Sequence, residues 1–203
     1  MSNDDISGTE KEKMLAGALY LASDPELARA RRRARRLCRL YNLTREDGPE
    51  ERTRLLQELF GRLGPRAEIE PSFQCDYGTN IEAGAGLYLN FGCVILDCAR
   101  VLIGDNVLMG PGVHIYTAHH PLDPEIRASG RELASPVTIE DNVWLSGGVI
   151  VCPGVTIGRE SVIGAGSVVT RDVPPRVVAV GNPCRVVRPL PDRTFSGDPR
   201  GSS

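Results

Sequence analysis

Aliphatic residues recur every six positions through the second half of the chain, and this period limits the possible folds more than any other feature. The positions in phase are Ile103, Met109, Ile115, Ile139, Leu145, Val151, Ile157, Ile163 and Val169. Four residues after most of them stands a second small or branched residue, such as Val107, Val149 or Ser161. This period matches neither the 3.6 residues of an α-helical turn nor the two-residue alternation of a flat strand.

A six-residue period fits a coil of short strands with a corner every six residues. The aliphatic side chain points to the coil axis, and glycine or a small polar residue makes the tight corner. Stacked coils pair their strands in parallel and bury one apolar column. The sequence therefore predicts a mainly β fold over residues 65–190, a parallel β-helix of hexapeptide repeats. An ordinary β-sandwich would instead show alternation and irregular turns.

Residues 116–136 break the period. The segment is polar and contains Pro121 and Pro124. We predict that it is a loop ejected from the coil, and long loops on a regular scaffold usually carry function. All three histidines of the chain, His114, His119 and His120, lie in or beside it.

Residues 1–64 have a helical pattern instead of the six-residue period. Apolar residues from Met14 to Ala22 follow helical spacing and predict a first helix. Ser23-Asp24-Pro25 predicts the cap and first residue of a second helix, and a third is expected near 49–60. Arginines cover much of the second helix, and we interpret them as a solvated face, with phosphate binding as the alternative. Residues 191–203 are predicted to be disordered.

Composition excludes several classes of function. The chain has 24 basic and 26 acidic residues, which gives no reason to expect binding to nucleic acid or an anionic membrane. No apolar run approaches the roughly 20 residues of a membrane helix, and the polar, acidic start is not a secretory signal. A cytoplasmic location is expected. The six cysteines lack CxxC spacing and are expected to be buried thiols, not disulfides or zinc ligands.

Four segments, in this order, resemble the maltose/galactoside O-acetyltransferase family, which includes nodulation acetyltransferases. They are E-K-M-L-A-G-A-L-Y (12–20), P-G-V-H-I-Y-T-A-H-H-P-L-D-P (111–124), P-V-T-I-E-D-N-V-W-L-S-G (136–147) and V-G-N-P-C-R-V-V-R (180–188). The resemblance implies a left-handed β-helix, usually a homotrimer, with acetyl-CoA in the groove between neighbouring coils and no metal. It implies acetyl transfer to a hydroxyl of a small, sugar-like acceptor, whose site the N-terminal helices cover.

The resemblance implies that His120, which directly precedes a proline, is the catalytic base. Transfer from a thioester to an alcohol requires removal of the alcohol's proton, and a neutral imidazole with a pKa of about 6.5 suits this task. The family transfers the acetyl group directly, so no nucleophilic cysteine is needed. We interpret His119 as a bystander, and Asp123 or Glu125 as a candidate to orient His120.

The resemblance also assigns residues to the two substrates. Asp76 and Asp97 match acceptor-contacting positions, although both also suit a turn. Lactose-type members carry two consecutive acids where this chain has Asp97-Cys98, which argues against a lactose-type acceptor. Asn90 matches an asparagine at the junction of acetyl group and acceptor, or is a structural corner residue. The positions that match the acetyl-CoA site are Trp144, Gly147, Ala165, Thr170, Arg171, Arg185 and Arg188, and arginines suit phosphates.

Three rival functions share parts of this pattern. A γ-type carbonic anhydrase would use the H-x4-H pair of His114 and His119, but zinc catalysis needs a third protein ligand from another coil. A non-catalytic scaffold would not require His120. The closest rival is a xenobiotic acetyltransferase that acts on antibiotics, but that class typically lacks the N-terminal helices.

Overall fold

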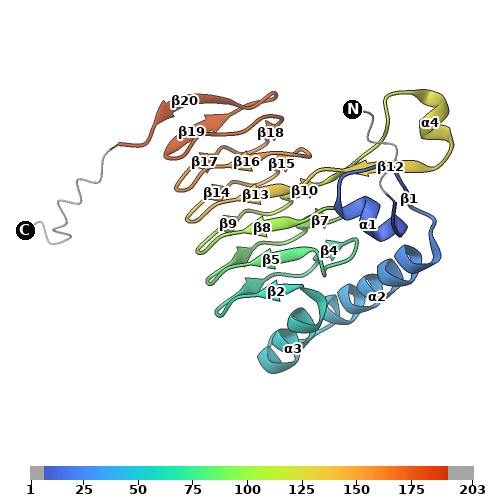
Figure 1. Ribbon diagram of the computed structural model, residues 1–203. Helices are drawn as coiled ribbons and strands as arrows, with labels where there is room; N and C mark the ends of the chain where they lie inside the picture. Colours follow the sequence, from blue (N-terminus) through green and yellow to red (C-terminus); the bar gives the residue numbers. More distant parts are fainter. Residues whose placement is uncertain (1–6, 192–203) are drawn as a thin grey trace, which may run out of the picture.

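The computed structural model, which describes residues 7–191, is a coil whose stacked strands form three sheets (Figure 1). A seven-stranded sheet contains β3 (Glu68–Ile69), β6 (Tyr88–Leu89), β9 (Leu108–Met109), β14 (Trp144–Leu145), β17 (Val162–Ile163), β19 (Val177–Val180) and β20 (Arg185–Pro189). A five-stranded sheet contains β4 (Gln74–Cys75), β7 (Val94–Leu96), β10 (His114–Tyr116), β15 (Ile150–Val151) and β18 (Val168–Val169). The third contains β2 (Arg62–Leu63), β5 (Ile81–Ala83), β8 (Val101–Ile103), β13 (Val137–Ile139) and β16 (Thr156–Ile157). Neighbouring strands are parallel, except that β20 runs antiparallel to β19.

The predicted aliphatic column forms the core of the coil. All nine in-phase residues are at most 2% exposed, and strand register stacks them, as in Met109, Leu145 and Ile163. Each such side chain contributes about 1.5–3 kcal/mol by leaving water. The hexapeptide β-helix predicted from the period is thus confirmed.

Two corners of the coil flank the five-stranded sheet and matter for the site. The corner before its strands comprises residues 90–93, 110–113, 146–149 and 164–167, and we call it the glycine corner. In its last two coils the chain turns at Gly148 and Gly166, each with φ of 69°. The corner after its strands comprises residues 76–80, 97–100, 117–136, 152–155 and 170–172, and we call it the loop corner. The strands of this sheet, two or three residues each, separate the two corners.

The first helix is shorter than predicted. α1 spans only Glu10–Leu15, and β1 (Tyr20–Leu21) follows where the apolar spacing predicted helix as far as Ala22. Gly17, with φ of 73°, reverses the chain direction after the helix, and β1 then gains a strand partner in the ejected loop. The prediction was wrong because tertiary pairing outweighed local spacing.

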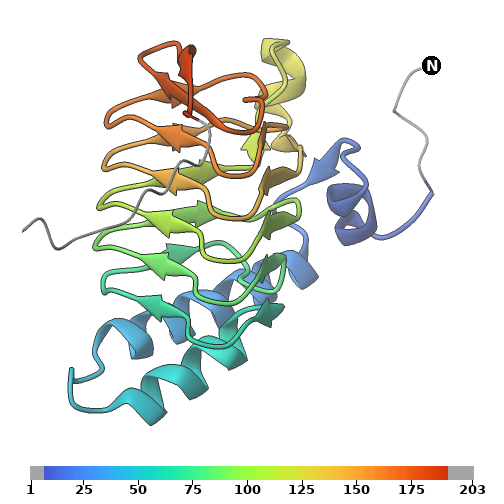
Figure 2. The ribbon, with the colours of Figure 1, turned by 90° about the vertical axis from the view of Figure 1, so that its left-hand side faces the viewer.

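The next two helices are confirmed. α2 (Pro25–Asn42) begins at proline, and the Asp24 carboxylate accepts hydrogen bonds from the amides of Glu26 and Leu27. Its buried residues are Leu27, Ala34, Leu37, Cys38 and Tyr41. α3 (Pro49–Leu59) contributes buried Leu55, Leu56 and Leu59. Both helices lie at the end of the coil where its first turn would otherwise be uncovered (Figure 2).

The segment that breaks the period leaves the coil as predicted, but it is not irregular. It forms β11 (Ala118–His119), α4 (Pro124–Ala128) and β12 (Arg131–Ala134). β12 pairs antiparallel with β11 on one side and with β1 on the other. The loop is therefore a three-stranded sheet completed by the N-terminal segment.

The remaining expectations concern the tail, the cysteines and membranes. The tail from residue 192 onward lies outside the described residues. The cysteines are free thiols, and Cys152 is less buried than the other five. Among residues 7–191, no helix combines the length and apolar character that a bilayer crossing requires.

Candidate active site

His120 stands at the end of an ordered strand. It directly follows β11, whose Ala118 and His119 are paired with Ala134 and Leu133 of β12, and its side chain is exposed. On its other side, the Arg127 guanidinium donates to the carbonyl of Pro121 at 3.0 Å. The backbone is thus fixed on both sides of an imidazole that remains open to solvent.

The other two histidines have partners of their own. The His119 Nε2 atom is 3.2 Å from the Ser135 hydroxyl, and burial followed by the nearby His120 lowers the pKa of His119. The His114 Nδ1 atom is 2.6 Å from the Tyr116 hydroxyl. Within residues 7–191 no three His, Cys, Asp or Glu side chains lie close enough together to hold a metal ion.

The Asp123 carboxylate, a candidate to orient His120, caps a helix instead. It accepts hydrogen bonds from the amides of Glu125 and Ile126 at the start of α4. Glu125 is exposed in the same helix. The Asp123 carboxylate therefore stabilises the start of α4.

Asp97 lies behind the surface of the loop corner. It is 0% exposed, and its carboxylate accepts from the amides of Asp76 at 3.0 Å, Tyr77 at 2.8 Å and Asn80 at 3.3 Å. Burial raises the pKa of Asp97 to about 7, against these hydrogen bonds. These three hydrogen bonds support the turn-forming role considered for Asp97. Asp76, in the same turn, is partly exposed to solvent.

Sequence reasoning missed the residues that surround Asp76. The Cys98 thiol donates to the Asp76 carboxylate at 3.5 Å, and burial raises the pKa of Asp76 despite Arg31 and Arg35. The Arg31 guanidinium also donates to the Tyr77 hydroxyl at 2.6 Å. The arginine run was interpreted as a solvated face, and no local signal distinguishes Arg31, because its partners lie about 45 residues away in the chain.

The glycine corner brings together three residues matched to the acetyl-CoA and junction positions. Gly147 and Ala165 occupy the same place in successive coils, where the Gly166 amide donates to the Gly147 carbonyl at 3.0 Å. Asn90 lies two coils before Gly147 in the same corner, and its side-chain oxygen accepts from the Phe91 amide at 2.7 Å. This contact also fits the alternative that Asn90 is a structural residue of the corner. Because the corner has few side chains, an extended ligand can approach its backbone closely.

The other matched residues lie on three further elements. Trp144 is 50% exposed on the outer face of β14. Thr170 is exposed just after β18, and Arg188 lies on β20 opposite Val178. Arg171 and Arg185 line one cavity of about 150 Å³ beside Cys184. Two of the arginines expected at phosphates are thus brought together, although they lie 14 positions apart in the chain.

Comparison with known proteins identifies the family. A model described as the maltose acetyltransferase hexapeptide capping motif matches residues 13–64, and one for the bacterial transferase hexapeptide (six repeats) matches residues 136–171. Nodulation protein L of Rhizobium meliloti is 53% identical over 89% of this chain and 99% of its own. A crystal structure of a maltose O-acetyltransferase from Clostridium difficile has a TM-score of 0.91 at 51% identity, covering 92% of this chain and all of that one. This chain belongs to the maltose/galactoside O-acetyltransferase family.

A second solved structure adds a bound ligand to the comparison. A galactoside acetyltransferase in complex with coenzyme A has a TM-score of 0.88 at 38% identity and covers 97% of this chain and all of that one. The resemblance stated from four short segments is confirmed over nearly the whole chain, which is therefore an acetyltransferase.

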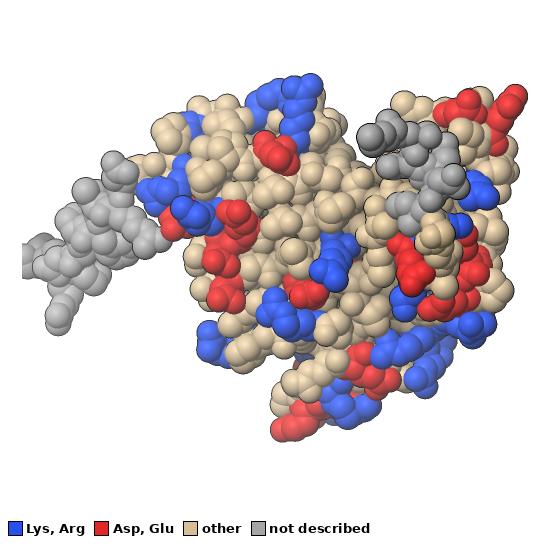
Figure 3. All heavy atoms as spheres, viewed as in Figure 1, with Lys and Arg blue, Asp and Glu red and all other residues tan. Residues whose placement is uncertain are grey.

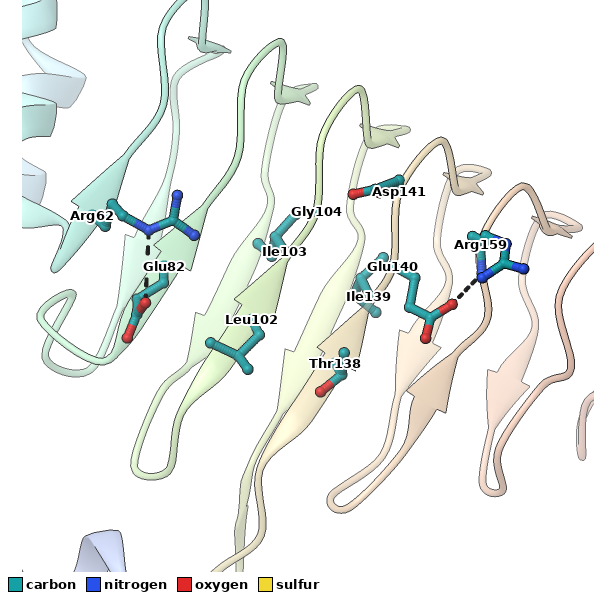
Figure 4. A pocket seen from close by; sticks show the side chains of 10 residues that line it. All are labelled: Arg62, Glu82, Leu102, Ile103, Gly104, Thr138, Ile139, Glu140, Asp141 and Arg159. Atoms are coloured by element: carbon teal, nitrogen blue, oxygen red, sulfur yellow. Dashed lines mark hydrogen bonds and ion pairs between the residues drawn. The ribbon is translucent and has the colours of Figure 1, made fainter.

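A hollow of about 540 Å³ on this acetyltransferase lies away from the predicted site. It sits on the outer face of the sheet that contains β8 and β13, and none of the predicted site residues lines it (Figure 4). Arg62 is paired with Glu82, and the Arg159 amide donates to the Glu140 carboxylate. In the space-filling view, acidic and basic side chains lie next to one another over this face (Figure 3). Its charges are thus largely balanced within the chain.

Proposed function

We propose that the protein transfers the acetyl group of acetyl-CoA directly to a hydroxyl of a small, sugar-like acceptor, with His120 as general base. The observation that carries the proposal is an exposed imidazole on a fixed backbone, at the same corner of the coil as Asp76. A partly exposed carboxylate beside Arg31 suits hydrogen bonding to sugar hydroxyls. Asp97 then holds the Asp76 turn from behind.

His120 carries the proton through the reaction. Its neutral imidazole takes the proton of the acceptor hydroxyl as that oxygen forms a bond to the thioester carbonyl carbon. When the carbon–sulfur bond breaks, the imidazolium returns the proton to the leaving sulfur. The acetyl group ends on oxygen, the thiol is released, and His120 is neutral again. The cysteines take no part, consistent with the burial of five of the six.

The residues of the chain fit the donor substrate. The glycine corner offers backbone groups with little side-chain obstruction at Gly147 and Ala165, which suits a long, thin pantetheine arm. Arg171 and Arg185, at a shared cavity, suit its phosphates because a guanidinium donates paired hydrogen bonds. We assign Trp144, Thr170 and Arg188 to the same ligand. Acetyl-CoA is a cytoplasmic metabolite, in line with the predicted location.

We further propose that the enzyme works as a homotrimer. His120 and Asp76 belong to the loop corner, whereas Asn90, Gly147 and Ala165 belong to the glycine corner. The two corners of one chain lie at opposite ends of the strands of the five-stranded sheet, so they face different directions. A neighbouring copy that sets its glycine corner against this loop corner would bring the base and the acetyl group together.

The test is release of the CoA thiol from acetyl-CoA at pH 7.5 across maltose, a methyl galactoside, a chitin-derived oligosaccharide and chloramphenicol. His120→Ala is compared with His119→Gln, a change at the adjacent histidine. Acceptor-dependent release should fall by about 100-fold or more in His120→Ala and by far less in His119→Gln. Equal losses in both variants would refute His120 as the base. Preference for chloramphenicol over every sugar would instead support the antibiotic-acetylating class.

A further inference from the structure

Besides the backbone pairing of β1 with β12, one part-buried side-chain hydrogen bond joins the N-terminal segment to the ejected loop. The Tyr20 hydroxyl donates to the Glu132 carboxylate at 2.9 Å, across 112 residues of sequence. Tyr20 is 0% exposed and lies opposite Glu132 in the β1–β12 pair. A charged acceptor makes such a bond one of the stronger kinds in a protein.

This hydrogen bond lies one strand away from the proposed base. β12 uses its other edge to pair with β11, so that His119 is opposite Leu133, the residue after Glu132. His120 is the next residue of the chain. A shift of β12 therefore moves the backbone of His120 with it.

The ring of Tyr20 faces the acceptor side of the site. It packs in a buried cluster with Met14, Leu27, Tyr77, Cys98, Ala99 and Ala134. Within this cluster, Cys98 donates to the Asp76 carboxylate and Tyr77 accepts from Arg31. Burial first, and then Cys98 and Glu132, raises the pKa of the Tyr20 hydroxyl, which therefore stays a donor at any working pH.

We propose that Tyr20 is a positioning residue, which fixes the His120 loop relative to the Asp76 side of the acceptor site through its hydrogen bond to Glu132. The inference rests on the proposed role of His120. Tyr20 belongs to a cluster that includes Tyr77, Cys98 and Ala99 of the coil, and its hydroxyl bonds Glu132 of the loop outside the coil. Misplacement of a reacting group by about 1 Å costs up to about 100-fold in rate.

The first experiment compares Tyr20→Phe with Tyr41→Phe. Both changes delete one buried hydroxyl, but that of Tyr41 donates to the carbonyl of Ile69 under α2 and α3, away from the loop. Tyr20→Phe should lower kcat about tenfold with the best acceptor of the panel, while KM for acetyl-CoA changes less than about twofold. It should also speed amide hydrogen exchange in residues 117–134, measured by mass spectrometry. Equal effects of the two variants on kcat and on exchange would overturn the proposal.

A double-mutant cycle tests whether Tyr20 acts through Glu132. Glu132→Leu removes the acceptor of the Tyr20 hydroxyl, and adding it to Tyr20→Phe should cause no further loss of kcat beyond the larger single effect. Losses that multiply would show that the two residues act independently and would contradict the proposal. If His120→Ala keeps full activity, the proposed base fails, but exchange in residues 117–134 still decides whether Tyr20 holds the loop. The same exchange measurement decides the case if no acceptor in the panel supports turnover.

Discussion

Replacing Asp97 by asparagine should make the stability of the protein less dependent on pH. The Asp97 carboxyl is wholly buried, and its pKa rises from an ordinary 3.8 to about 7 in the fold. Between these values the folded protein binds a proton at Asp97 that the unfolded chain releases. Stability from this group is therefore fully present below about pH 4 and is lost as the pH rises through about 7.

The size of the effect follows from the two pKa values. A rise of this size corresponds to a decrease of about 4 kcal/mol in the free energy of unfolding between pH 4 and pH 8. The substituted asparagine would carry no charge in either state, so the variant lacks this contribution. Its amide oxygen can still accept from the amides of Asp76 and Tyr77, which both donate to one oxygen of Asp97.

The assay is urea unfolding of both proteins, followed by circular dichroism at one protein concentration from pH 4 to pH 8. Other groups titrate in both proteins, so the informative quantity is the difference between them. This difference should shift by about 4 kcal/mol in favour of Asp97→Asn as the pH rises. A difference that stays constant within about 1 kcal/mol would show that the three amide donors keep the pKa of Asp97 low, and would refute the reasoning. Asp97→Ala, which strands those donors, should be destabilised at every pH.

Two further predictions concern the glycine corner and the arginine cavity. Gly147→Ser should leave the melting temperature nearly unchanged, because an added Cβ meets nothing closer than 3.4 Å. Gly148→Ser, at φ of 69°, should cost about 1–2 kcal/mol, and equal melting temperatures for the two variants would contradict this strain. Arg171→Ala should raise the Kd for acetyl-CoA about tenfold in calorimetry, whereas Arg159→Ala, in the hollow on another face, should not. Equal affinities of these two variants would remove Arg171 from the donor site.

The coil was predictable because its rule is local and repeated. Every sixth residue meets the same environment, so Ile103, Leu145 and Val169 all indicate the same buried column. One position that departs from the pattern therefore does not change the predicted fold. The helix after Asp24 was predictable for a similar reason, since cap and proline are adjacent in sequence. The first helix was mispredicted because Tyr20 pairs with a strand more than 100 residues away, which no local window contains.

The candidate site could be proposed from sequence where a short motif matches the family, and not where it depends on contacts between distant segments. His120 is proposed because it matches the histidine that the family carries directly before a proline. From sequence, Asp97 is an aspartate at a position that matches an acceptor contact. Only its burial and its three amide donors indicate that it supports the Asp76 turn instead. Arg31 could not be distinguished from the other arginines of its helix by sequence, because its hydrogen bond to the Tyr77 hydroxyl appears only in the fold.

The relative position of the proposed base and the Asp76 turn could not be predicted from the sequence. The coil positions residues along its own axis, but the proposed chemistry needs groups from outside that repeat: a base on an ejected loop and a carboxylate turn at its root. Regular strand pairing within the coil fixes neither relative to the other. The N-terminal segment does so, because Tyr20 packs against Cys98 of the coil and bonds Glu132 of the loop. A segment that covers the acceptor side would on this view also set the alignment of the base, so changes in it should alter kcat as well as acceptor choice.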